Sequence, residues 1–376
     1  MEKKRIYWID GLKFLACLCV FYSHFQGFFL GLCDKDLGYS AQFRFIMESS
    51  FNILKNGNLW VCMFCVISGY FASKKKIDSL KKLIYTIWNR YLRFLIPFFV
   101  VNLLAYILCH TVGFQTQKYG HIFGNSWFGD FYNFDVTLWI VVRASIKLTS
   151  ELNSPLWMIL QLFIGTCVIY LYKYLLSKIS AIYVNTIVLV GYLAIIIGFP
   201  EIHASYLYSI ITCMGVLLNV FMEKNIWKVK SALMNSFCLG AIFLMVSWGQ
   251  NALVQTFSIQ LPEYATNYMN AIYALFFLII MEKLQGCQKV LSSSIFRKVG
   301  NLSFGIYVLH WLVLSTFSLW FYGILQGKIV IEGIFFLNLI ITTIVVMIGA
   351  KLFYEIVEKR LMKVPGIVCK MVWNWK

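Results

Sequence analysis

The chain has 376 residues, of which 60% are apolar and only 13% charged, and its mean hydropathy is +0.74. This apolar share exceeds what the core of a soluble domain needs, so the composition excludes an ordinary soluble protein. The net charge of +17 would suit nucleic acid, but the Lys and Arg residues lie in clusters between apolar stretches, not along one helix face. We therefore expect a polytopic membrane protein surrounded by lipid, with no nucleic-acid partner.

Helices that cross the hydrocarbon need apolar runs of about 17 to 25 residues. The sequence contains ten such runs, and no internal repeat or Pro-rich linker divides them. They predict an all-α bundle of about ten transmembrane helices in a single domain over residues 1–376. The runs lie near residues 7–31, 52–72, 91–111, 155–176, 180–199, 205–222, 231–249, 266–282, 303–322 and 333–354.

The distribution of basic residues between these runs predicts the orientation. Cytoplasmic loops of membrane proteins are enriched in Lys and Arg, and one alternate set of connections, which includes both termini, carries twenty-three of them against seven in the opposite set. Both termini are therefore expected in the cytoplasm, as an even number of spans requires. A bacterial cytoplasmic membrane is the expected location.

The longest polar connection, near residues 112–153, falls on the predicted outer side. It contains the aromatic-rich stretch GNSWFGDFYNF, from Gly124 to Phe134, which suggests a folded cap or an interfacial segment. A connection of this length is more often functional than idle. The eleven cysteines lie mostly within apolar runs and predict no disulfide framework, and Cys62-x-x-Cys65 lacks the second pair that a metal site would need.

The first run, YWIDGLKFLACLCVFYSHFQGFF, carries an acid, a base and an imidazole into a span. Eleven residues at 100° each return to within about 20° of the starting direction, so Lys13 and His24 share a helix face, about 16 Å apart along the axis. Asp10 lies close to the same face. Polar residues in spans usually face a bundle interior or a water-filled cavity. Two structural readings stay open: an interfacial Asp10–Lys13 ion pair, and a His24 that is simply hydrogen-bonded between helices.

Two further polar groups follow in chain order. Ser68-Gly69-Tyr70 ends the second run with a small residue where backbones can approach closely, and helix packing is the simpler interpretation. Arg90 and Arg93 enter the third run three residues apart on one face. Two guanidiniums at that depth need an anionic partner, either a lipid phosphate or a ligand phosphate.

Later runs add more candidates. The fourth begins SPLWMILQLF, with Trp157 suited to the outer interface and Gln161 a turn further on. The ninth begins GNLSFGIYVLHW, and spacings of four and three place Ser303, Tyr307 and His310 on one face. For His310, a site role and a packing hydrogen bond both remain open.

These motifs together resemble the acyltransferase-3 family of integral membrane O-acyltransferases. Lys13, ten residues and then His24 are similar to its Arg/Lys-x10-His signature. FCVISGYF resembles its Ser-Gly-Phe/Tyr segment, RYLRFLIP its Arg-x-x-Arg entry, LWMILQLF its Leu-Trp-Phe-Leu segment, and LSFGIYVLHW its Ser-Tyr-x-Ile-Tyr-Leu-x-His segment. The order and spacing agree over nearly the whole chain, in the manner of the stand-alone ten-span branch.

The resemblance implies transfer of an acyl group, acetyl or succinyl, from a coenzyme A thioester to a hydroxyl of a carbohydrate or glycolipid. His24 would be the general base, with Asp10 paired to Lys13. Lys13, Arg90 and Arg93 would hold the polyanionic coenzyme, and Ser68, Tyr70, Trp157, Gln161, Ser303, Tyr307 and His310 would line the substrate cavity. Acyl-CoA would be a co-substrate, with no permanently bound cofactor, and self-association is compatible with this reading.

Two positions depart from the family pattern. Lys13 stands where many relatives have Arg, which keeps the charge but not the bidentate geometry, and Gln161 stands where some branches have Glu. A transporter without catalysis also places charged residues on inward faces. An acyltransferase consumes the coenzyme A thioester, whereas a transporter does not, so this measurement distinguishes the two classes of protein.

Overall fold

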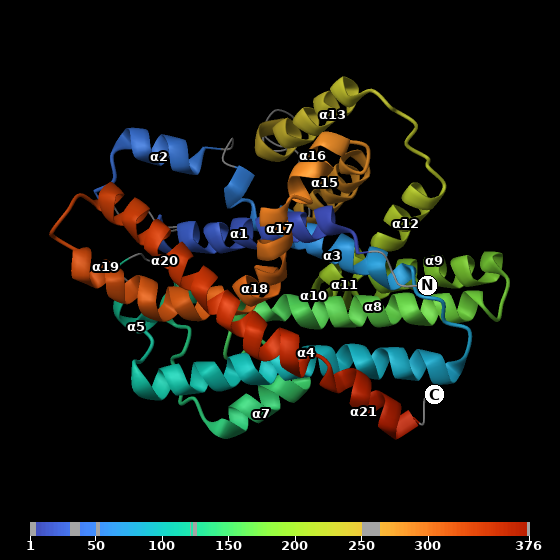
Figure 1. The fold of residues 1–376 in the computed structure, drawn as a ribbon, viewed down its shortest axis with the longest axis horizontal. Coiled ribbons are helices and arrows are strands. Elements are labelled where there is room, and N and C mark those ends of the chain that lie inside the picture. Colours follow the sequence, from blue (N-terminus) through green and yellow to red (C-terminus); the bar gives the residue numbers. More distant parts are fainter. Residues whose placement is uncertain are drawn as a thin grey trace. The chain divides into compact units, whose positions relative to one another are not determined.

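The computed structural model describes residues 5–30, 38–49, 53–120, 122, 126–249 and 264–373. Within these ranges the regular structure consists of helices, with no strand (Figure 1). The all-α prediction is therefore confirmed for the described chain. The runs of apolar residues explain this, because in lipid a helix satisfies every backbone hydrogen bond within its own segment.

Contacts group the chain into two units, each discontinuous in sequence. Unit 1 comprises residues 1–57, 95–157 and 289–362, and unit 2 comprises residues 58–94, 158–288 and 363–376. Each unit is described here by itself. The prediction of one domain over the whole chain stays a prediction.

Three helices form the centre of unit 1, and each packs against the next. The first helix α1 (Tyr7–Phe29) packs along α18 (Ser303–Val313), and α18 packs along α20 (Ile331–Phe353). The other elements that fall in unit 1 are α2 (Ala41–Glu48), η1 (Ile53–Lys55), α5 (Thr116–Tyr119), α6 (Ser126–Gly129), α7 (Leu138–Lys147), η2 (Ser154–Leu156), α17 (Ser294–Val299), η4 (Gly300–Leu302), η5 (Leu314–Ser318), α19 (Leu319–Leu325), η6 (Tyr354–Leu361) and the second half of α4 (Leu80–Thr111).

Small residues allow this close packing. A Cβ added to Gly305 of α18 would lie 3.0 Å from the Cα atom of Ala350 on α20, and one added to Gly300 would lie 3.2 Å from the backbone of Asp10. Membrane helices gain no hydrophobic energy from one another in lipid, so close van der Waals contact through small residues holds them together.

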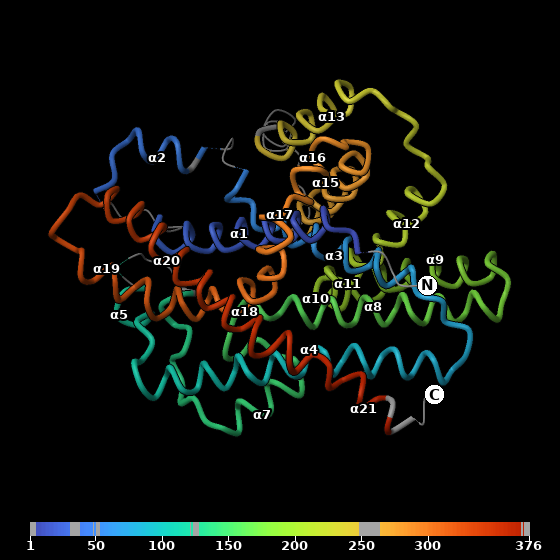
Figure 2. The backbone as a smooth tube through the Cα atoms, in the orientation of Figure 1, coloured from blue at the N-terminus to red at the C-terminus, as the bar shows by residue number. Residues whose placement is uncertain are grey.

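In unit 2, glycines bring α3 (Gly57–Ser73) close to α11 (Leu207–Cys213) and α12 (Gly215–Glu223), and they bring α8 (Trp157–Leu176) close to α11. Gly69 and Gly165 each face the α11 segment, and a Cβ on Gly165 would meet Ser209 O at 2.6 Å. Helices α8 and α9 form an antiparallel hairpin, visible as the green tubes in Figure 2. The elements of unit 2 are α3 (Gly57–Ser73) from residue 58, the first half of α4, α8 (Trp157–Leu176) from residue 158, α9 (Ala181–Gly198), α10 (Pro200–Ser205), α11 (Leu207–Cys213), α12 (Gly215–Glu223), α13 (Ala232–Leu244), η3 (Met245–Gly249), α15 (Ala265–Met281), most of α16 (Gln285–Leu291) and α21 (Val364–Trp373).

Helix lengths bear on the predicted number of spans. In the described chain six helices are long and apolar enough to cross a membrane, or seven if the bent pair formed by α15 and α16 counts as one span. Three shorter apolar helices cover residues 57–73, 207–223 and 232–247. Every predicted run thus contains helix, but the count of ten crossings stays a prediction.

The long connection near residues 112–153 is folded. Helices α5, α6 and α7 lie within it, the Tyr132 hydroxyl donates to Leu152 O at 2.8 Å, and the rings of Phe114 and Tyr132 stack with centroids 3.6 Å apart. Residues 121 and 123–125 of this connection, including Gly124 of the quoted stretch, lie outside the described residues. Its predicted location on the outer side is not tested by the structure.

Candidate active site

Near the start of α1, the Asp10 carboxylate forms ion pairs with two basic side chains. Its Oδ1 atom lies 2.7 Å from Lys13 Nζ, and its Oδ2 atom lies 2.6 Å from Arg5 Nε. Arg5 also donates from Nη2 to Asn301 Oδ1 at 2.6 Å. The hydrogen bond to Asp10 raises the pKa of Arg5. The Asp10–Lys13 pair was one interpretation of the sequence. Arg5, which precedes α1, and Asn301, which binds Arg5, were not singled out, because neither shares the periodicity of that helix.

Toward the other end of α1, His24 meets His310 of α18. The His24 Nδ1 atom lies 2.8 Å from His310 Nε2, and the two rings stack with centroids 5.0 Å apart and an angle of 22° between their planes. His310 is fully buried. The sequence had placed each histidine on a polar helix face, and the structure brings the two together within unit 1.

The hydrogen bonds of His310 determine which nitrogen carries each proton. His310 Nδ1 lies 3.1 Å from the carbonyl oxygen of Ile306, and because a carbonyl only accepts, this nitrogen must be protonated. In a neutral imidazole the other nitrogen, Nε2, is then an acceptor, so His24 Nδ1 donates to it. This assignment makes Nε2 the unprotonated nitrogen of a neutral His24.

Aromatic rings enclose the histidine pair. Trp311, fully buried, meets the His24 ring edge-on at 6.0 Å between centroids, and the ring of Phe21 meets His310 at 6.4 Å. A low-dielectric setting strengthens hydrogen bonds between the polar groups that it contains. Trp311 follows His310 directly in the sequence, but nothing in its spacing distinguished it from a core residue.

Two of the candidates on α18 make hydrogen bonds that position the helix. The Tyr307 hydroxyl donates to the carbonyl oxygen of Pro155, and Ser303 Oγ donates to Gly300 O at 3.0 Å. Asn153 Nδ2 adds a bond to Val308 O at 2.8 Å. Trp157, at the start of α8, is half-buried. The segment before α8 and the helix that carries His310 are therefore linked by polar contacts.

The arginine pair belongs to unit 2. Arg90 Nη2 donates to Ser68 Oγ at 2.8 Å, and the guanidinium carbon lies 4.5 Å from the centroid of the Phe94 ring. Arg90 Nε is buried with no hydrogen-bond partner among the described residues. Arg93 is exposed. The structure thus joins two motifs that were separate in the sequence, Ser68-Gly69-Tyr70 and Arg90-x-x-Arg93.

Tyr70 and Gln161, also in unit 2, make mainly structural contacts. The Tyr70 hydroxyl accepts from Lys74 Nζ. Gln161 Oε1 accepts from Ser209 Oγ at 2.7 Å, and its Nε2 donates to Ser205 O at 2.8 Å. These bonds tie α8 to α10 and α11. The sequence had suggested a cavity role for both side chains, and that role stays a prediction.

The predicted site residues therefore fall into two groups, one in each unit. The group in unit 1 consists of Asp10, Lys13, His24, Trp157, Ser303, Tyr307 and His310, and the group in unit 2 consists of Ser68, Tyr70, Arg90, Arg93 and Gln161.

Comparison with known proteins assigns nearly the whole chain to one family. The model of the acyltransferase-3 family, described as an acyltransferase domain, matches residues 6–355. No curated protein and no solved structure matches the chain. The matched range contains every residue of both groups. The chain therefore belongs to the acyltransferase-3 family of membrane acyltransferases.

Proposed function

We propose that this protein is an O-acyltransferase that moves an acyl group from a cytoplasmic coenzyme A thioester to a hydroxyl of an extracytoplasmic carbohydrate or glycoconjugate. The acyl group is acetyl or succinyl. The observation that carries the proposal is the hydrogen-bonded pair of His24 and His310. A membrane acyltransferase needs a base for the acceptor, and this pair supplies an imidazole with a defined unprotonated nitrogen.

The unprotonated Nε2 atom of His24 is the base in the proposed acyl transfer. A sugar hydroxyl is a weak nucleophile at neutral pH, so a base must take its proton as its oxygen attacks the thioester carbonyl. His24 Nε2 accepts the proton, and His310 fixes the ring orientation by accepting the hydrogen bond from Nδ1. The carbon–sulfur bond breaks as the ester forms, and the proton held on His24 Nε2 passes to the leaving coenzyme A thiolate, which returns His24 to its neutral form.

His310 also stabilises the charge that forms on His24. When Nε2 gains a proton, the ring becomes a cation whose Nδ1–H still donates to His310. Hydrogen bonds with an ionised partner are roughly twice as strong as neutral ones. The pair is therefore better bonded in the transition state than before it, which is the requirement for catalysis.

Cationic side chains would receive the phosphates of coenzyme A. Arg93 is exposed, and Arg90 has a buried Nε without a hydrogen-bond partner in the described chain. Guanidiniums bind phosphate oxygens through paired N–H groups. In unit 1, Lys13 is already paired with Asp10, so its role is to add positive charge there with a fixed orientation.

The proposal includes an orientation. The excess of Lys and Arg in one set of connections supports placing both termini in the cytoplasm of a bacterial cell, with the coenzyme bound from that side. The acceptor would then approach from the outer face.

The direct test uses the purified protein in proteoliposomes with acetyl-CoA or succinyl-CoA labelled in the acyl group. Cell-envelope glycans from the source cells are the acceptor. We expect release of free coenzyme A thiol together with base-labile label on the glycan. Absence of thioester consumption with every donor and acceptor fraction would contradict the proposal.

A further inference from the structure

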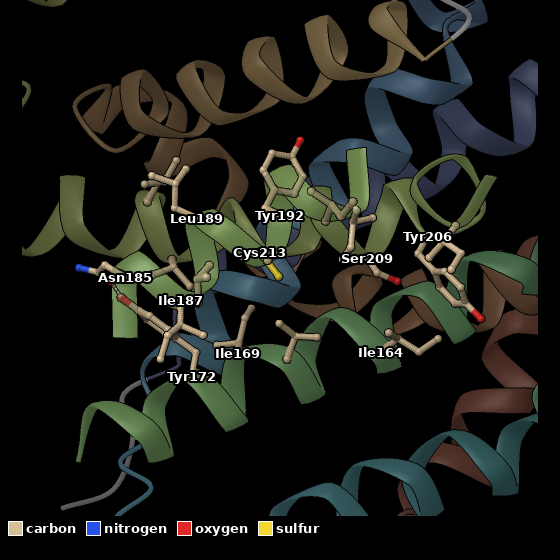
Figure 3. Close-up of a pocket in the computed structure, with 18 residues that line it drawn as sticks. Ile164, Ile169, Tyr172, Asn185, Ile187, Leu189, Tyr192, Tyr206, Ser209 and Cys213 are labelled. Carbon is tan, nitrogen blue, oxygen red and sulfur yellow. Dashed lines mark hydrogen bonds between the residues drawn. The ribbon is translucent and has the colours of Figure 1, made fainter. Parts of the chain in front are cut away.

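Unit 2 contains an apolar cavity that the acyl-transfer residues do not use. Its volume is about 650 Å³, and helices α8, α9, α11 and α12 line it (Figure 3). Ile169 and Cys213 form part of one wall, and Val188 and Ile195 of α9 form part of another. Cavities of this size lie within the range that accommodates small ligands.

Helix α9 forms the open side of this cavity. Of its eighteen residues only Val184 is buried, and Ile187, Val188 and Leu189 are 61%, 50% and 58% exposed. The helix is nevertheless long and apolar enough to cross a membrane. Its exposed face therefore meets hydrocarbon, and the cavity beside it is within reach of lipid chains.

The side-chain oxygens of Ser209 and Tyr192 on the cavity wall already have partners. Ser209 Oγ is bonded to Gln161, and the Tyr192 hydroxyl lies 2.9 Å from the hydroxyl of Tyr268, so it points away from the cavity (Figure 3). A sugar or nucleotide in this space would lose its hydrogen bonds to water without replacement. An unfilled space would lose the dispersion contacts of its lining. A hydrocarbon chain has no hydrogen bonds to lose and supplies dispersion contacts to the lining, so it suits this cavity.

The cavity is about as long as the hydrocarbon layer of one bilayer leaflet is thick. Its lining on α9 extends from Asn185 to Ile195, a distance of about 15 Å along the helix axis. The hydrocarbon core of a bilayer is about 30 Å thick, so one leaflet contributes about half of this thickness. A single lipid chain that enters from one side of the membrane therefore matches the cavity in length.

Lysine residues lie near one end of the cavity. There Tyr172 donates to Asn185 Oδ1 at 2.9 Å, closing the cavity between α8 and α9. Lys173 follows Tyr172 directly, and Lys178 lies in the short connection to α9. On the neighbouring helix, Lys224 follows Glu223 at the end of α12. Three lysines against one acid favour an anionic headgroup at this end.

We propose that this cavity is a binding site for a membrane phospholipid, with one hydrocarbon chain between α8, α9, α11 and α12 and the phosphate beside Lys173 and Lys178. The lipid fills the space between α9 and the rest of unit 2. The site is independent of acyl transfer, because its occupant is neither donor nor acceptor.

The experiment uses the full-length protein in nanodiscs that contain a phosphatidylglycerol with a photoreactive diazirine in one acyl chain. After illumination, labelled peptides are identified by mass spectrometry. Labelling is expected on the α8 and α9 peptides that carry Ile169, Val188 and Ile195. Label restricted to other helices, or a crosslink from this face to a second copy or another protein, would overturn the proposal.

Two glycines of α9 give a matched pair of variants. An added Cβ meets nothing within 4 Å at Gly191 or at Gly198, but only Gly191 lines the cavity. Gly191→Leu should reduce chain labelling roughly fivefold, as expected when overpacking opposes binding by about 1 kcal/mol. Gly198→Leu should label like the unmodified protein. Equal labelling of the two variants would contradict the site.

Two more variants extend the test. The first is a control for misfolding, and the second tests the position of the lipid headgroup. Val188→Phe narrows the cavity from the same helix and should lower labelling as Gly191→Leu does, with unchanged elution in detergent. Lys173→Gln together with Lys178→Gln should remove the preference for phosphatidylglycerol over phosphatidylcholine while chain labelling persists. A preference that survives this double change would overturn the placement of the phosphate.

Discussion

His24 Nδ1 and His310 Nε2 lie 2.8 Å apart although 286 residues separate them in the sequence. The contact joins α1 to α18, and the bond from His310 Nδ1 to Ile306 O fixes the direction of the whole chain of hydrogen bonds. In this arrangement the bond to His310 engages the Nδ1 atom of His24. The proposed reaction uses the opposite nitrogen.

Replacement of His24 tests the base. His24→Ala should lower kcat by about 10² to 10⁴, the usual contribution of a general base. Membrane insertion should not suffer, since removing a polar group from a span does not hinder it. Turnover of the labelled acyl-CoA measures the first effect, and yield and elution in detergent measure the second. A variant with near-normal turnover would exclude His24 as the base.

Replacement of His310 separates positioning from packing. His310→Leu removes the acceptor for His24 Nδ1 and should lower kcat with little change in KM for the donor. His310→Gln keeps an acceptor oxygen and should retain more activity than the Leu variant, while still falling below the natural protein. Thermal stability of His310→Gln in detergent should stay unchanged. Lower stability of that variant with unchanged kcat would identify a packing role instead.

Replacement of Arg93 tests the contact with the coenzyme. Arg93→Ala should raise the apparent KM for acyl-CoA, by about tenfold if one charge-assisted phosphate bond is lost, and Arg93→Lys should raise it less. The rate at saturating donor should change little, because uniform binding affects KM and not kcat. Lys289→Ala, which removes another exposed cation, is the control. A KM that stays constant in Arg93→Ala would favour a lipid-facing arginine.

Gly69 tests whether the Ser-Gly-Tyr motif is needed for helix packing. A Cβ at this position would overlap the backbone of Thr212 on α11, so Gly69→Ala should destabilise the protein by about 1–3 kcal/mol. Gly240→Ala is the control, because nothing lies within 4 Å of its Cβ position and alanine favours a helix by roughly 0.5–1 kcal/mol. Melting curves in detergent compare the two. An equal effect of both changes would show that the close approach is not required.

The sequence by itself determined that this protein is helical and lies in a membrane, and it identified its family. Apolar runs and helix periodicity are local properties of the chain, so they can be read without knowing which helices touch. The same periodicity placed Lys13 and His24 on one face, and Ser303, Tyr307 and His310 on another. The pairing of Asp10 with Lys13, three residues apart on one helix, was likewise within reach of local geometry.

Only the tertiary structure decided which of these faces meet. The contacts between His24 and His310, between Arg5 and Asn301, and between Arg90 and Ser68 each join separate segments of the chain. Residue spacing along one helix carries no information about the partner helix or its register, which depend on close packing at small residues. The lipid-sized cavity beside α9 has the same origin, because a space between helices exists only once those helices have packed.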